Sequence, residues 1–138
     1  MRRPWVALLL ACIALPVGAC TPSGAPARSE IAQAQAGGLT VVLLSGGSAL
    51  PQGRGTFTLE FRSQADNQLT EVGDVTVSAT MPMAGMAPMF GRVTARRTDI
   101  PGRYDVESDL GMVGSWRIGV EWTSGDGTES VLLSGRVQ

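Results

Sequence analysis

The sequence predicts an all-β fold, an immunoglobulin-like antiparallel β-sandwich of about seven strands over residues 39–138. Three observations lead to this prediction. Apolar and polar residues alternate with a period of two in most segments of this region, which is the pattern of half-buried strands. Turn signals rich in Gly, Pro, Asp and Asn separate these segments at regular intervals. No segment has a convincing helical period.

The expected strands begin with the apolar, β-branched run at residues 39–44, which ends at a Ser-Gly-Gly turn. The second strand, 56–62, alternates cleanly between apolar and polar residues. The later strands are expected at 75–81, 92–97, 103–107, 116–122 and 130–137. A hairpin turn is expected at residues 124–127. The side chains that this pattern turns inward supply a core that needs no disulfide: Phe57, Phe61, Tyr104, Trp116, Ile118 and Val120.

The N-terminus has the layout of a bacterial secretory signal. Two arginines precede the apolar run Trp5–Val17, and small residues lead to Cys20. The run is too short to cross a bilayer as a helix. The motif Val-Gly-Ala-Cys resembles a lipobox, so we expect residues 1–19 to be a lipoprotein signal peptide and Cys20 to carry the lipid. Ordinary signal cleavage after Ala19 is the alternative.

A lipid on Cys20 would hold the protein at a membrane of the cell envelope, on the periplasmic or extracellular face. Thr21, rather than Asp, follows the cysteine, which favours the outer membrane if the source is Gram-negative. Residues 20–38 are rich in Ala, Pro, Ser, Gln and Gly, and we expect them to be a flexible tether.

Composition excludes several classes of function. The 138-residue chain has no His and no Lys, which removes the commonest general base and the commonest metal ligand. Its two cysteines are Cys12 and Cys20, so the predicted domain has neither a thiol nor a disulfide. The formal net charge is −1 and no basic patch is present, which argues against nucleic-acid binding. We therefore expect neither an enzyme nor a nucleic-acid partner.

The stretch Met81–Met89, which reads MPMAGMAPM, carries the chemistry of the chain. Thioether sulfur is a soft ligand that prefers Cu(I) to hard divalent ions, and Pro and Gly keep the segment irregular. The candidate metal ligands are Met83, Met86 and Met89, followed by Met81 and Met112. The ring face of Trp116 is expected to offer the ion a cation–π contact.

Two other interpretations of this stretch stay open. Methionine fills irregular gaps in cores and packs well against aromatic rings. Met81 continues the inward alternation of the preceding strand, and Met112 has apolar neighbours, so both are candidates for core packing. Alternatively, the loop is an exposed apolar surface that binds a partner protein.

A row of acidic residues is the weaker candidate site. Asp105, Glu107 and Asp109 alternate along one expected strand and would share one of its faces. Such a face offers oxygen ligands to a hard cation, but a solvated strand face is the favoured interpretation.

The order of motifs resembles the YtkA-like and FixH-like domains of bacterial envelope proteins. A Met/Pro loop is followed by Gly102-Arg103-Tyr104 and then by Leu110-Gly111-Met112-Val113-Gly114-Ser115-Trp116. The resemblance covers about residues 39–138. It implies an immunoglobulin-like β-sandwich, an extracytoplasmic place and an association with the handling of copper or other heavy metals, including metal-efflux adaptors.

The sequence therefore predicts a lipid-anchored envelope protein that binds a soft metal ion, Cu(I), through its Met-rich loop for metal delivery or resistance. The alternative is a structural or interaction module without a metal. Its Met/Pro loop would dock onto an efflux or oxidase-assembly protein.

Overall fold

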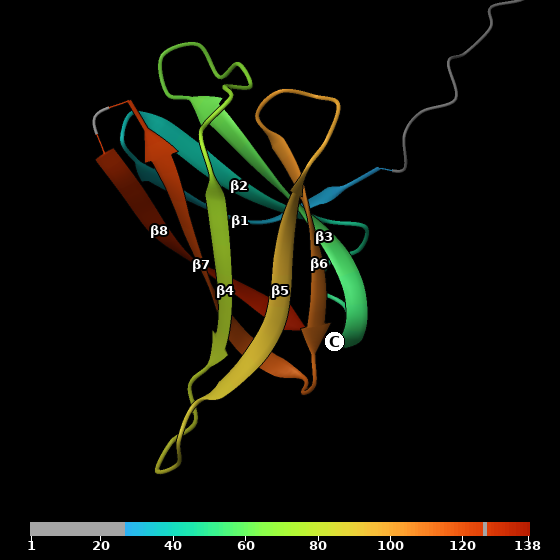
Figure 1. Cartoon of the computed structure of the whole chain (residues 1–138). Helices are drawn as coiled ribbons and strands as arrows, with labels where there is room; N and C mark the ends of the chain where they lie inside the picture. Colours follow the sequence, from blue (N-terminus) through green and yellow to red (C-terminus); the bar gives the residue numbers. More distant parts are fainter. Residues whose placement is uncertain (1–26, 126) are drawn as a thin grey trace, which may run out of the picture.

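The computed structural model describes residues 27–125 and 127–138, so the predicted signal peptide and Cys20 lie outside the described residues. Eight strands and no helix are present in this part of the chain (Figure 1). The strands are β1 (Ser29–Ala36), β2 (Leu39–Ser45), β3 (Gly53–Ser63), β4 (Val75–Met81), β5 (Met89–Arg97), β6 (Arg103–Leu110), β7 (Gly114–Ser124) and β8 (Gly127–Val137). The described residues hold no helix that is long and apolar enough to span a membrane.

All neighbouring strands pair antiparallel, in the order β1-β2-β3-β6-β5-β4-β7-β8. The sheet curls back on itself, and β4 and β5 lie in front of β1 and β2 in Figure 1. A Cβ atom built on Gly135 of β8 would lie 3.6 Å from Cγ2 of Ile31 in β1, so the first and last strands meet. This arrangement confirms the all-β prediction and is consistent with a β-sandwich.

Strand β1 corrects the prediction of a flexible tether at residues 20–38, which was wrong for residues 29–36. This strand pairs with β2 from Ser29↔Ser45 to Ala36↔Leu39. Its small side chains Ala32, Ala34 and Ala36 pack against the core, while the glutamines between them are exposed. The domain therefore has eight strands rather than seven, and it begins before residue 39.

The core contains the side chains that the alternation turns inward. All six predicted core residues are buried, with exposed fractions of 3% or less: Phe57, Phe61, Tyr104, Trp116, Ile118 and Val120. The Phe61 ring packs edge-on against Tyr104 and Trp122, with centroid distances of 5.4 and 5.3 Å. The two tryptophans of β7 lie near opposite ends of that strand, and Trp116 lies at the end that carries the methionines.

Candidate metal centre

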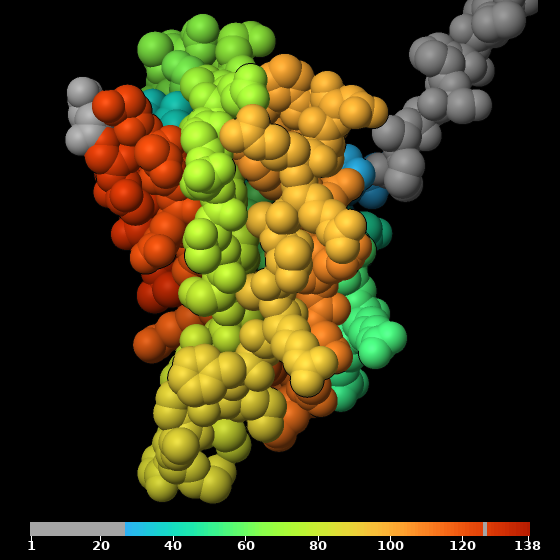
Figure 2. Space-filling view, viewed as in Figure 1, coloured from blue at the N-terminus to red at the C-terminus, as the bar shows by residue number. Residues whose placement is uncertain are grey.

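The Met stretch forms the tip of the β4–β5 hairpin, which projects from one end of the molecule (Figures 1 and 2). The two strands pair as Ala79↔Gly91, Thr80↔Phe90 and Met81↔Met89. Residues directly opposite each other in an antiparallel pair have Cβ atoms about 4.5–5.5 Å apart and point to the same face. The hairpin therefore brings Met81 and Met89 together at its base.

Both paired methionines are half-buried and pack against the core. Strand β4 also pairs with β7 as far as Thr80↔Arg117, so Met81 lies next to the first residues of β7. A Cβ atom built on Gly114 would lie only 2.6 Å from the Met81 methyl carbon. Gly114, with φ at +137°, thus leaves the space that the Met81 thioether occupies.

The loop beyond this pair carries the other two methionines. The backbone N–H of Met86 donates to the carbonyl of Met83 at 3.4 Å, and Gly85 between them has φ at +73°. This turn folds the loop back on itself. Met83 is half-buried, whereas the Met86 side chain is 64% exposed. The tip thus offers one sheltered and one open thioether.

Met112 lies in the short β6–β7 loop at the same end of the molecule (Figure 1). The indole Nε1 of Trp116 donates to the Met112 carbonyl at 2.9 Å and ties this loop to the core. Met112 itself is 40% exposed, so its side chain is not part of the buried core. Trp116 is fully buried, and its hydrogen bond positions the loop that carries Met112. The cation–π contact between its ring and a metal ion stays a prediction.

Gly91 is a supporting residue that the sequence analysis did not single out. A Cβ atom there would lie 2.5 Å from Cδ2 of Leu110 and 3.1 Å from Cζ3 of Trp116. Gly91 therefore lets these two side chains fill the core beneath the methionine pair. One sequence signal could have identified Gly91. A glycine at an inward position of a strand often marks a place where another part of the protein approaches the backbone closely.

The arrangement places soft, neutral candidate ligands of one kind at the same end of the fold. Met81 and Met89 are paired by register, Met83 and Met86 belong to the same hairpin loop, and Met112 is on the adjacent loop. A three-coordinate thioether set suits Cu(I) and disfavours hard cations. Across the described ranges 27–125 and 127–138, no group of three or more His, Cys, Asp or Glu residues has a geometry for holding a metal.

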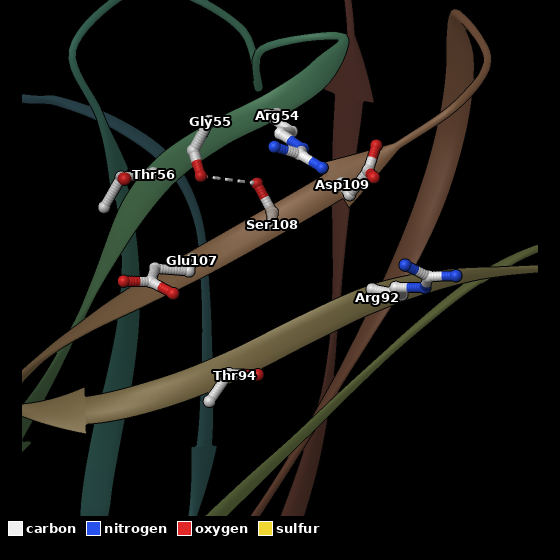
Figure 3. Close-up of a pocket in the computed structure, with 8 residues that line it drawn as sticks. All are labelled: Arg54, Gly55, Thr56, Arg92, Thr94, Glu107, Ser108 and Asp109. Carbon is white, nitrogen blue, oxygen red and sulfur yellow. Dashed lines mark hydrogen bonds between the residues drawn. The ribbon is translucent and has the colours of Figure 1, made fainter.

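The acidic row on β6 faces arginines rather than a cation site. Asp109 lies between Arg54 of β3 and Arg92 of β5, its direct cross-strand neighbours, beside an open hollow of about 560 Å³ (Figure 3). Glu107 pairs with Arg96 at 3.2 Å, and Asp105 accepts a hydrogen bond from Thr58 at 2.9 Å. These contacts favour the solvated strand face.

Comparison with known families gives one result. A family model described as YtkA-like matches residues 33–121, which include the Met hairpin, the second half of β1 and most of β7. No curated protein and no solved structure matches the chain. The FixH-like part of the resemblance and its link to metal handling stay predictions.

Proposed function

The chain belongs to the YtkA-like family, and from this premise we propose that it binds Cu(I) through thioether sulfur at the β4–β5 hairpin. We further propose that it does so in the cell envelope, held by a lipid on Cys20, for copper delivery or resistance. The chemistry would be exchange of a soft ion between thioether sites, with no covalent step and no catalysis.

The observation that carries the proposal is the Met81↔Met89 register. Two flexible thioethers start from neighbouring positions on one face, and the core holds their stems. A pair that is already placed loses less conformational entropy when it binds an ion.

The third ligand would come from the loop. Met83 and Met86 are separated from the pair by only a few residues, and the turn between them directs the loop back toward its base. Met112 is the alternative third ligand, because Trp116 anchors its backbone at the same end. Neutral methionine ligands hold Cu(I) more weakly than cysteine thiolates, so the ion stays exchangeable, as a carrier requires.

The test is a Cu(I) competition titration on the full chain under reducing conditions, in mild detergent. Cys12→Ser and Cys20→Ser are introduced in every sample, because a free thiolate would compete for the ion. The key variant replaces Met81 and Met89 by Leu, a nearly volume-conserving change. The control variant, Leu132→Ala, changes an exposed apolar residue of β8 and leaves every candidate ligand in place.

We expect the parent chain to bind one Cu(I). The variant with both Met81→Leu and Met89→Leu should lose at least about tenfold in Cu(I) affinity. Even changes outside the first ligand shell of a metal site lower the affinity by about 10–100-fold. Circular dichroism must show that the variant is folded. Equal affinity in the parent and the paired variant would show that the hairpin is not the site.

One observation favours a second function, in which the same end docks onto an efflux or oxidase-assembly protein. Phe90 is 75% exposed and Val113 is 55% exposed, and both lie at the same end of the fold as the exposed Met86 and Met112. Such a group of exposed apolar residues is typical of an interaction surface. If Cu(I) does not bind, site-specific crosslinking from position 90 in the intact envelope would identify the partner.

A further inference from the structure

The five methionines of the domain differ strongly in exposure. Met86 is 64% exposed and Met112 is 40% exposed. Met81, Met83 and Met89 are half-buried, and the two that form the strand pair also pack against the core. An oxidant that reaches sulfur from solvent therefore meets Met86 first.

Oxidation changes the ligand character of methionine. A hydroperoxide transfers one oxygen atom to the thioether: an S–O bond forms, the O–O bond breaks, and water or an alcohol leaves. Sulfur loses two electrons and the peroxide gains them. The product is methionine sulfoxide, which is polar and is restored by reductases. Its accessible donor is a hard oxygen, which Cu(I) does not favour.

We propose that Met86 is an oxidation site and that its sulfoxide releases Cu(I) from the hairpin. The proposal rests on the proposed copper function and adds a regulation of that site. The modifying reagent is a hydroperoxide, and the modified atom is the Met86 sulfur. Copper would be retained under reducing conditions and set free when peroxide accumulates.

The fold is expected to survive this modification. Met86 lies at the tip of the hairpin, next to Gly85, for which a built Cβ atom meets no atom within 4 Å. A sulfoxide there remains in water. The same change at Met81 or Met89 would place a polar oxygen against the core, which destabilises the domain unless a hydrogen bond compensates. Because Met86 is exposed, its oxidation could release the ion while the domain stays folded.

The experiment treats the full chain, with Cys12→Ser and Cys20→Ser, with stepwise additions of hydrogen peroxide. Peptide mass spectrometry gives the sulfoxide fraction at each methionine. After the peroxide has been removed, Cu(I) competition under reducing conditions gives the affinity of the same samples. Met86→Leu removes the reactive sulfur, and Met112→Leu is the matched control with the other exposed methionine removed. Circular dichroism follows the fold.

We expect Met86 to oxidise before the other four methionines of the domain and the Cu(I) affinity to fall at least about tenfold as it does so. Each variant is compared with its own untreated sample. The affinity of Met86→Leu should not respond to the same peroxide dose, whereas the affinity of Met112→Leu should fall by the same factor as that of the parent. Oxidation that starts at another methionine of the domain, or unchanged affinity after Met86 has oxidised, would overturn this inference alone. If the untreated parent binds no Cu(I), the proposed function fails, and the switch fails with it.

Discussion

Glu60 offers the sharpest test of the fold, because it is a carboxylate that is only 1% exposed. It lies on β3 between two arginines. Arg62 donates from Nε to Oε2 at 3.0 Å and also from Nη2, while Arg103 donates from Nε and Nη2 to Oε1 at 2.9 and 2.6 Å. Glu60→Gln keeps the shape of the side chain, removes the charge and turns an amide NH₂ group toward one of the arginines.

The size of the effect follows from these contacts. A hydrogen bond to a charged group contributes about 1.5–3 kcal/mol to stability, and the variant loses the charged partner of both guanidinium groups. The side chains of Arg62 and Arg103 are 33% and 24% exposed, so water screens part of the loss. We therefore expect Glu60→Gln to lower the free energy of unfolding by about 2–3 kcal/mol. The control, Glu107→Gln, breaks an exposed pair and should lose less than about 1 kcal/mol.

The pH dependence provides a second readout. Burial alone raises the pKa of Glu60, but the hydrogen bonds from Arg62 and Arg103 and their charges outweigh it and hold the pKa below the ordinary value of 4.5. Above pH 4.5 the carboxylate is charged in both the folded and unfolded states, so its full contribution is present. As the pH falls through the lowered pKa of the folded state, this contribution is lost.

Urea unfolding, followed by the fluorescence of the buried tryptophans, measures both effects. The stability difference between the parent and Glu60→Gln should stay constant above about pH 5 and shrink as the pH falls below 4.5. A difference no larger than that of Glu107→Gln, or one that grows in acid, would refute the reasoning.

Three further predictions concern the fold around the methionine end and the first strand, and urea unfolding measures each. Trp116→Phe should destabilise more than Trp122→Phe by about 1 kcal/mol, because only Trp116 loses a hydrogen bond; Nε1 of Trp122 has no partner among the described residues. Equal losses would contradict an anchored β6–β7 loop. Gly91→Ala should cost about 1–3 kcal/mol by crowding the core beneath it, and a neutral result would disprove the close packing. Ala34→Asp should cost about 1–3 kcal/mol and Gln35→Asp almost nothing, whereas a flexible tether would tolerate both alike.

Most of the fold could be predicted because seven of the strands carry a visible signal. Strand β7 alternates over Trp116, Ile118, Val120 and Trp122, all of which are buried. Strand β1 was missed because its inward residues are mainly alanines, which have weak β-propensity and low hydrophobicity. Its strand conformation depends on pairing with β2 and packing on the core, and these are contacts with distant parts of the chain.

The sequence identifies the candidate site by residue type but not by geometry. Clustered methionines indicate a soft-metal site at any register, yet only the strand pairing decides which two of them meet. The sequence placed the start of the strand after the loop at residue 92, whereas β5 begins at Met89. The loop contains no two-residue turn motif that would fix the register. The Met81↔Met89 pair is therefore a product of the tertiary fold.

In the proposed copper carrier, the hairpin would divide two demands between its base and its tip. A site that retains the ion needs ligands whose positions are already fixed, and the pair at the base is fixed by strand register and by the core beneath it. A site that exchanges the ion needs a ligand that a partner can displace, and Met86 is open to solvent at the tip. Because methionine carries no titratable proton, neither group of ligands competes with protons for the ion, in contrast to Cys and His. The same exposure that would permit transfer leaves the tip sulfur open to oxidation, so exchange and sensitivity to peroxide would arise from one structural feature.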